Sequence, residues 1–328
     1  MTNKIFKICM IGCGDIACTQ HGPAIKRYEK LHKNTLFAAC CDINKQRAKD
    51  FKERFELPRY YADTDTMLDT EKPDVVSLIV PPEVTAELSC KIFAKGYPLI
   101  LEKPPGMTPE ETSKMIKAAK NIPNQVAFNR RYMPLVQKAM DMIKEWDCSI
   151  FDINYRMLRV NRRDTNFEAT AIHGIDLVKH IAKSSYKQLN FRYNELPQYG
   201  KTVANFHLNG KMENGVIVHL DFLPMSGITI ERVEINTANG LICLHLPFGA
   251  GCYDAPGKLI HFAENKEVLT VCGEGETCDN YIQSGFYNEN AQFFNDVRQG
   301  NIPKDDIISG LQSVEIATLI SKRQGSMQ

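Results

Sequence analysis

Two short stretches of the sequence carry side chains that could move a proton or hold a developing negative charge. In LILEKPP, residues 99–105, a glutamate and a lysine follow three apolar residues directly, and two prolines end the segment. Proline cannot donate to a neighbouring strand, so we expect Lys103 at the tip of a buried strand, in a position fixed by the turn. In HGIDLVKHI, residues 173–181, His173 and Asp176 share a face if the segment is helical. An ammonium at a rigid tip can stabilise an oxyanion, and an imidazole can exchange a proton near neutral pH.

Each stretch also has a purely structural interpretation. Glu102 and Lys103 could be a solvated charge pair at a strand end, and His173 could be a structural histidine beside an apolar helix. His173, Asp176 and His180 could together ligate a metal ion, but no further cluster of ligand-type residues accompanies them, so we predict no metal site. The strands and helices predicted around these residues help to decide between a structural and a functional role.

The first third of the chain alternates short apolar runs with segments of helical periodicity. Strands are expected at 4–11, 36–41, 73–80, 97–101 and 125–129, and helices at about 17–31, 44–55, 83–95 and 108–121. This spacing indicates βαβ units and a parallel sheet with helices on both faces. Ligands bind such sheets at the carboxyl ends of the strands, so residues at those ends should line one crevice.

A glycine turn follows the first of these strands. In GCGDIA, residues 12–17, Gly12 permits a tight turn and Gly14 lets the backbone approach a pyrophosphate. Asp42 ends the second strand, where a carboxylate accepts hydrogen bonds from ribose hydroxyls and repels a 2′-phosphate. We therefore predict binding of NAD in preference to NADP, although Arg47, one helical turn further on, could soften that preference or be a solvated surface charge.

The pattern changes after about residue 125. Alternating apolar and polar residues predict strands of an open, mostly antiparallel sheet at 149–158, 219–224, 228–235 and 240–247. The predicted fold class is α/β, with an N-terminal doubly wound Rossmann domain over residues 1–125 and a C-terminal α+β domain over residues 126–328.

Bulk composition limits the classes of partner. The chain has 328 residues and a net charge of +1, so it has no general attraction for nucleic acid or for a membrane surface. No apolar run approaches the length of a membrane span. The eleven cysteines contain no Cys-x-x-Cys pair, and we expect reduced thiols in a cytoplasmic protein.

A resemblance to a known family connects the motifs. The chain resembles the Gfo/Idh/MocA oxidoreductases, the glucose–fructose oxidoreductase and inositol dehydrogenase group, in the segments GCGDIA (12–17), VVSLIVPP (75–82), EKPPGMT (102–108), FNRRYMP (128–134) and HGIDLVKHI (173–181). The resemblance implies an NAD-dependent dehydrogenase or reductase that acts on a hydroxyl or keto carbon of a sugar, polyol or sugar derivative. It implies that the first domain binds the dinucleotide and that the second binds substrate. It also implies a homodimer or homotetramer formed through the free face of the second sheet.

The resemblance assigns roles to individual residues. Lys103 and His173 would be catalytic, and the Lys103–Pro104 bond would be cis. The residues expected to bind the cofactor are Gly12, Gly14, Asp15, Ile16, Asp42, Pro81, Glu102 and Lys103. The residues expected to bind substrate are Asp176, Arg131, Tyr155 and Arg156. The last two alternate along one strand, so only one of them can face a ligand.

Two positions depart from the family pattern. Inositol-type members carry an aspartate four residues before the histidine, where this chain has Ala169, and the adjacent Glu168 would point elsewhere on a helix. The histidine that usually stands near the start of the helix after Pro82 is replaced by Thr85 and Glu87. A proton relay through an aspartate at position 169 is therefore not available.

Two other functions are compatible with the motifs. Some relatives use a retained NAD transiently, in oxidation–elimination hydrolysis of glycosides, and a cofactor that survives purification without net NADH formation would indicate this function. Others are non-catalytic, cofactor-sensing regulators. Loss of the catalytic lysine would indicate a regulator, and Lys103 is present.

Overall fold

The computed structural model describes residues 4–249, 252–274 and 279–327. The chain divides into two compact units, one made of residues 1–128 and 285–314 and the other of residues 129–284 and 315–328. Each unit is built around its own β-sheet.

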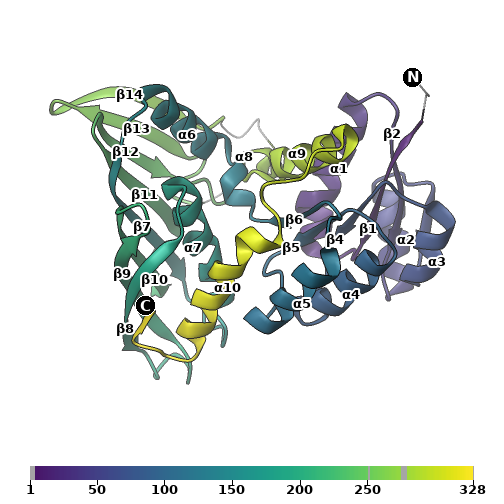
Figure 1. The fold of residues 1–328 in the computed structure, drawn as a ribbon, viewed down its shortest axis with the longest axis horizontal. Helices are drawn as coiled ribbons and strands as arrows, with labels where there is room; N and C mark the ends of the chain where they lie inside the picture. The colour runs from purple at the N-terminus through teal and green to yellow at the C-terminus, as the bar shows by residue number, and fades with distance from the viewer. Residues whose placement is uncertain (1–3, 250–251, 275–278, 328) are drawn as a thin grey trace. The chain divides into compact units, whose positions relative to one another are not determined.

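The expected single boundary between residues 125 and 126 needs a correction. Residues 285–314 were assigned to the second domain, but they pack with the first unit. Helix α9 (Phe286–Gln299) buries Phe293 and Phe294 in the core of that unit, and Figure 1 shows it beside α1 (Gly22–Leu31). The return of the chain depends on apolar contacts between segments far apart in sequence, which local periodicity does not reveal.

The first unit contains a six-stranded parallel sheet with the order β3-β2-β1-β4-β5-β6. This is the order of doubly wound dinucleotide-binding sheets, in which the direction of winding reverses between β1 and β4. The predicted parallel sheet is confirmed. The strands are β1 (Phe6–Ile11), β2 (Thr35–Cys41), β3 (Arg59–Tyr61), β4 (Val75–Leu78), β5 (Leu99–Glu102) and β6 (Asn124–Ala127).

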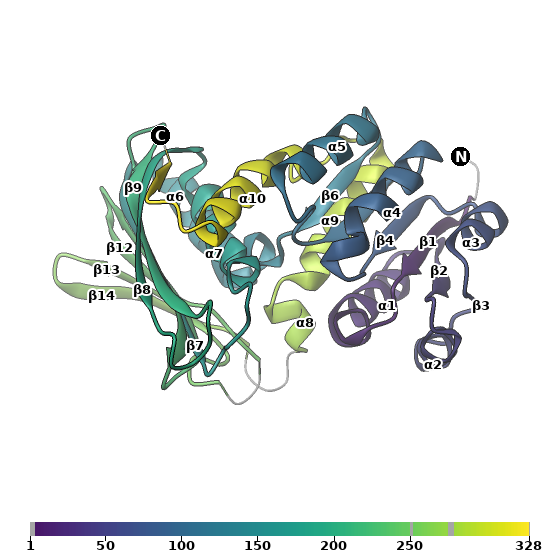
Figure 2. The ribbon, with the colours of Figure 1, turned by 90° about the horizontal axis from the view of Figure 1, so that it is seen from below.

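Helices connect these strands and cover both faces, with α4 and α5 on one side and α1 and α2 on the other (Figure 2). Thr108 caps α5, since its Oγ1 accepts from Glu111 N at 3.2 Å, and Glu111 Oε2 accepts from Met107 N at 2.8 Å. The short β3 and α3 were not predicted, since three and eight residues leave little periodicity. The remaining helices are the short π-helix η1 (Ala17–His21), α2 (Lys45–Arg54), α3 (Thr64–Glu71), α4 (Pro82–Ala94) and α5 (Pro109–Ala119).

The second unit contains a nine-stranded sheet with the order β14-β13-β12-β11-β7-β10-β9-β8-β15. Every neighbouring pair is antiparallel except β7 and β10, so the predicted mostly antiparallel sheet is confirmed. The strands are β7 (Ile150–Val160), β8 (Tyr186–Glu195), β9 (Ala204–Met212), β10 (Ile217–Ser226), β11 (Ile230–Thr237), β12 (Gly240–His245), β13 (Lys258–Ala263), β14 (Lys266–Cys272) and β15 (Ser326–Met327).

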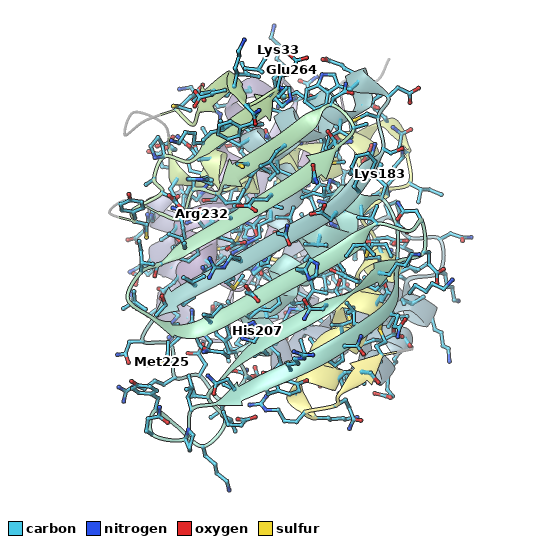
Figure 3. All side chains as sticks on the ribbon, turned by 90° about the vertical axis from the view of Figure 1, so that its left-hand side faces the viewer. Lys33, Lys183, His207, Met225, Arg232 and Glu264 are labelled. Carbon is cyan, nitrogen blue, oxygen red and sulfur yellow. The ribbon has the colours of Figure 1, made fainter. Side chains whose placement is uncertain are left out.

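One face of the nine-stranded sheet is buried and the other is open. Ile153, Tyr155 and Met157 of β7 are buried in a core shared with α6 (Pro134–Trp146) and α7 (Glu168–Ala182). Figure 3 looks onto the opposite face, where His207 and Arg232 are labelled. The other helices described here are the 3₁₀ turn η2 (Asn129–Tyr132), α8 (Asn280–Gln283) and α10 (Ile307–Ser321).

No helix in the described part of the chain is long and apolar enough to cross a membrane. The cysteines that the structure describes are all free thiols.

Candidate cofactor and catalytic site

The turn after β1 contains Gly12 and Gly14, and the protein's own packing requires glycine at the first position but not at the second. Gly12 has φ of +95°, and a Cβ there would lie 1.9 Å from the carbonyl oxygen of Ile79. Only glycine therefore fits at position 12. A Cβ on Gly14 would meet nothing within 4 Å, so the protein's own packing does not require glycine there. The open space over Gly14 fits a group that approaches the backbone closely.

Asp42 connects the end of β2 to this glycine turn. Its Oδ2 accepts a hydrogen bond from Cys13 N at 2.9 Å, and its Oδ1 accepts one from Asn44 N at 2.8 Å. Asp42 is half-buried. Each carboxylate oxygen has a second lone pair, so the group can still accept hydrogen bonds from a ligand. The carboxylate and the open backbone of the turn suit the ribose and pyrophosphate of a dinucleotide.

The other residues predicted to bind cofactor lie at the same edge of the sheet. Asp15 and Ile16 are exposed immediately before η1, and Pro81 stands between β4 and α4. Glu102 ends β5 and Lys103 follows it, both half-buried, and the Lys103–Pro104 bond is cis as expected. The structure thus gathers these residues at the carboxyl ends of parallel strands. Their contact with a cofactor stays a prediction.

A histidine that sequence reasoning missed connects η1 to the end of β5 at this edge. His21, at the end of η1, is fully buried, and its Nε2 lies 3.0 Å from Glu102 Oε1. Glu102 Oε2 accepts a hydrogen bond from the backbone N of Lys103 at 3.1 Å. The available signal was a histidine one turn into the helix that starts at the glycine turn, at a position expected to be buried.

His173 lies on α7 in the second unit and is half-buried. Asp176, three residues on, is almost fully buried and binds Arg131 through Nε at 2.7 Å and Nη2 at 2.5 Å. The structure therefore brings two predicted substrate residues, Asp176 and Arg131, together as a buried ion pair. Their contact with substrate stays a prediction.

Tyr155 and Arg156 lie on opposite faces of β7, as the alternation predicts. Tyr155 is buried, and its hydroxyl donates to Glu231 Oε1 at 2.6 Å. Burial and the neighbouring Glu231 carboxylate raise the pKa of Tyr155 well above its usual value. Arg156 is exposed on the open face, where its Nε lies 3.4 Å from Asp221 Oδ2.

A buried ionic cluster surrounds Glu231 in the second unit. Arg130 donates to Glu231 through Nε at 2.5 Å and Nη2 at 2.9 Å, and Arg159 donates through Nη2 at 2.6 Å. Burial raises the pKa of Glu231, but Arg130 and Arg159 lower it more, to about 2. The side chain of Arg159 is 2% exposed, because β7 continues to Val160, beyond the strand end expected at residue 158.

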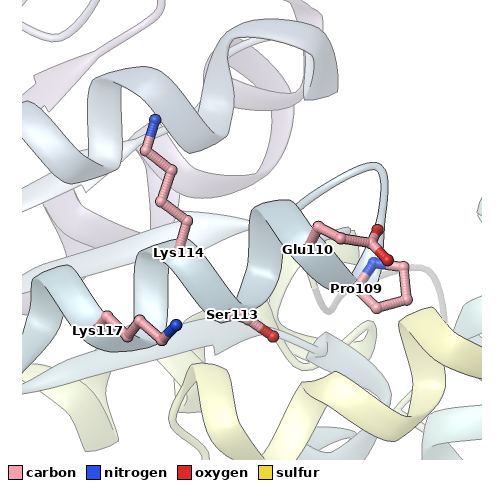
Figure 4. Close-up of a pocket in the computed structure, with 5 residues that line it drawn as sticks. All are labelled: Pro109, Glu110, Ser113, Lys114 and Lys117. Carbon is pink, nitrogen blue, oxygen red and sulfur yellow. The ribbon is translucent and has the colours of Figure 1, made fainter.

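A shallow hollow on the surface of α5 is separate from these residues. Figure 4 shows its lining, which is Pro109, Glu110, Ser113, Lys114 and Lys117. It contains no predicted site residue. Within the described ranges, no group of three or more His, Cys, Asp or Glu side chains could hold a metal ion.

Comparison with known families bears on the first unit. Residues 6–129 match the GFO_IDH_MocA model, described as an oxidoreductase family with an NAD-binding Rossmann fold. Residues 6–129 are therefore similar to the NAD-binding domain of the Gfo/Idh/MocA family. The match includes the glycine turn, Asp42 and the Glu102-Lys103-Pro104 strand tip.

Two of the curated proteins similar to this chain are named as dehydrogenases of carbohydrates. D-Glucoside 3-dehydrogenase of Escherichia coli is 28% identical over 129 residues, which cover 39% of this chain and 36% of that protein. Levoglucosan dehydrogenase of Pseudarthrobacter phenanthrenivorans is 32% identical over 106 residues, covering 32% of this chain and 27% of that protein. The matched segments therefore span only about a third of the length of these relatives.

Solved structures share the fold of this chain. Levoglucosan dehydrogenase in complex with NADH superposes with a TM-score of 0.83 at 18% identity, and 99% of each chain is covered. A Gfo/Idh/MocA family oxidoreductase from Vibrio cholerae gives a TM-score of 0.80 at 19% identity, with 97% of each chain covered. At these identities the likeness establishes the fold of both units.

Proposed function

We propose that the protein is an NAD-dependent dehydrogenase or reductase that acts on a hydroxyl or keto carbon of a sugar, polyol or sugar derivative. The observation that carries the proposal is the hydrogen bond from Cys13 N to Asp42 Oδ2, at the carboxyl edge of a sheet with the dinucleotide-binding strand order. That bond holds a carboxylate beside a glycine turn whose backbone is open at Gly14. The match of residues 6–129 to a family of oxidoreductases with an NAD-binding Rossmann fold supports the same function.

The proposed cofactor preference rests on Asp42. A carboxylate that already receives two backbone hydrogen bonds is held in place, and its remaining lone pairs suit two vicinal ribose hydroxyls. A 2′-phosphate at the same position would meet a like charge. NAD is therefore the proposed cofactor, preferred over NADP.

The proposed chemistry divides between two side chains. NAD, when bound, supplies the nicotinamide that accepts or returns a hydride. Lys103 is proposed to stabilise the alkoxide with its ammonium, as preorganised donors do where charge develops. His173 is proposed to take the hydroxyl proton during oxidation and to return it during reduction. Asp176 is occupied by Arg131, so we propose no relay from His173 through that carboxylate.

The proposed substrate class is carbohydrate. The printed names of two relatives, D-glucoside 3-dehydrogenase and levoglucosan dehydrogenase, support it. The first unit is proposed to bind the cofactor and the second to bind the substrate.

A screen of sugars, glycosides, inositols and sugar acids with NAD, followed by the absorbance of NADH, tests the proposal. We expect turnover with at least one carbohydrate, and a Lys103→Met control without it. Absence of turnover in both directions, with the corresponding keto compounds and NADH as well, would overturn the proposal. Bound NAD that survives purification, with glycoside cleavage and no net NADH, would indicate transient oxidation instead.

The open sheet face and the thiols bear on assembly and location. We propose a homodimer or homotetramer formed through the open face of the nine-stranded sheet. That face carries polar side chains, among them Arg156, His207 and Asp221, so its burial would need matched hydrogen bonds across the contact. Light scattering that gives the mass of a single chain, 37.2 kDa, at micromolar concentration would contradict this assembly. The free thiols support a cytoplasmic location.

A further inference from the structure

His21 is a fully buried polar side chain that the proposed chemistry does not use. Its two ring nitrogens both have partners within the first unit. Nε2 lies 3.0 Å from Glu102 Oε1, and Nδ1 lies 3.0 Å from Asn290 Nδ2 on α9. The ring also packs edge-to-face on Phe286, with centroids 5.1 Å apart. A buried imidazole with two directed hydrogen bonds has one orientation.

The neighbours of His21 fix the position of its proton. The Asn290 amide nitrogen also lies 2.8 Å from the carbonyl oxygen of Phe286, which can only accept, so the Nδ2 group is the donor toward both partners. His21 Nδ1 must then accept from Asn290, and the ring proton lies on Nε2. His21 therefore donates from Nε2 to Glu102 as a neutral imidazole.

Glu102 is held at both oxygens by this arrangement. Oε1 accepts from His21 Nε2, and Oε2 accepts from the backbone N of Lys103. Both oxygens act as acceptors, as in an ionised carboxylate. A neutral donor orients the Glu102 carboxylate and leaves its negative charge in place. A lysine or arginine at position 21 would cancel that charge.

We propose that His21 is a positioning residue: it orients Glu102 so that the strand tip carrying Lys103 has one geometry, and Asn290 keeps His21 in the required tautomer. This inference rests on the proposed function for the role of Lys103. Under this proposal α9 does more than pack against the first unit, because it also supplies Asn290, the partner of His21.

The tautomer is tested first, without any substrate. Long-range ¹H–¹⁵N spectra of the full chain should show His21 with a protonated Nε2 and an unprotonated Nδ1. The Asn290→Leu variant should lose this single tautomer. A protonated Nδ1 in the unaltered protein would overturn the assignment, whatever the enzyme's activity.

Three variants test the positioning role. His21→Gln keeps a side-chain donor near the place of Nε2, and His21→Phe removes it. His32→Gln is the matched control, since His32 lies in the same unit, stacks on the Tyr28 ring and has its Nδ1 3.0 Å from the Tyr28 carbonyl oxygen, away from Glu102 in the sequence. In His21→Phe we expect kcat to fall about 10-fold, the value of one hydrogen bond, with little change in the KM for the carbohydrate. His21→Gln should recover most of that loss, and His32→Gln should match the unaltered protein.

Hydrogen exchange provides a readout independent of turnover. The backbone amide of Lys103 should exchange about 10-fold faster in His21→Phe, because Glu102 is no longer held, and at its normal rate in His21→Gln. Equal kcat in the unaltered protein, His21→Phe and His21→Gln would overturn the role. So would equal exchange at Lys103. If no carbohydrate is turned over at all, the proposed function fails, while the spectra and the exchange rates still decide whether His21 orients Glu102.

Discussion

The strand-end site of the first unit and the ionic cluster of the second unit use charged side chains in opposite ways. At the strand ends, Asp42 and Lys103 are half-buried, and Asp42 binds backbone N–H groups rather than a countercharge. In the cluster, Glu231 is fully enclosed by Arg130 and Arg159. Charges that satisfy each other in the interior hold a fold together, whereas charges held at an open edge can still bind a ligand.

Among the residues of the strand-end site, Lys103 should give the largest effect on activity. Lys103→Met keeps the volume and removes the charge, and we expect kcat to fall by roughly 10²–10⁴, the range of a catalytic proton-transfer or oxyanion group. His173→Gln should fall within the same range. The double variant should lose less than the product of the two, because groups that act on one hydroxyl are not additive.

Steady-state and stopped-flow hydride transfer, with the substrate found in the screen, measure these losses. Lys114→Met, on the surface of α5, is the control and should have unaltered kinetics. A wild-type rate in His173→Gln would leave His173 a structural residue and Lys103 alone in the proposed chemistry.

Within the buried ionic cluster, replacement of Glu231 should cause the largest loss in the free energy of unfolding. Glu231→Gln leaves two buried guanidinium groups without a countercharge, and we expect a loss of roughly 3–5 kcal/mol in the free energy of unfolding. Glu234→Gln, on the exposed face of the same strand β11, should change it by less than about 0.5 kcal/mol. Urea unfolding measures both, and equal values for the two variants would contradict the difference between the regions.

The same cluster predicts a pH dependence. The pKa of Glu231 is about 2 in the folded protein and 4.5 in an unperturbed side chain, so the folded state favours the ionised form. Its contribution to stability is therefore complete above about pH 4.5 and is lost as the pH falls toward 2. Glu231→Gln should flatten this part of the stability profile. An equal loss of stability at low pH in Glu231→Gln and in the unaltered protein would show that other groups control this part of the profile.

Gly12 and Gly14 should separate folding from binding within the glycine turn. Gly12→Ala meets the Ile79 carbonyl and a positive φ, and we expect it to lose at least about 2 kcal/mol of stability. Gly14→Ala should fold within about 0.5 kcal/mol of the unaltered protein and yet bind NAD about 10-fold more weakly. Thermal unfolding and calorimetric titration with NAD measure the two effects. Unchanged NAD affinity in Gly14→Ala would mean that no ligand approaches that backbone.

Asp42 should affect the choice of cofactor and not the fold. Asp42→Asn keeps an oxygen for Cys13 N and removes the charge, so the ratio of kcat/KM for NAD to that for NADP should fall about 10-fold while the fold is kept. Asp50→Asn on the exposed side of α2 is the control. An unchanged ratio would place cofactor choice elsewhere.

The sequence by itself determined what depends on neighbours along the chain. Strand and helix periodicity predicted the parallel sheet, and the glycine turn, Asp42 and Lys103 were recognised because each directly follows a buried strand. The hydrogen bond that caps α5 is equally local, since Thr108 and its partner Glu111 are three residues apart. The alternation in β7 correctly placed Tyr155 and Arg156 on opposite faces.

Only the tertiary structure decided which distant side chains meet. Arg130 and Glu231 are 101 residues apart, and His21 and Asn290 are 269 residues apart. Periodicity shows that a position is buried, but it does not show which polar partner will satisfy a buried charge or imidazole there. That partner is set by how the segments pack, because a buried polar group must find its hydrogen bond wherever the fold brings a donor or acceptor to it.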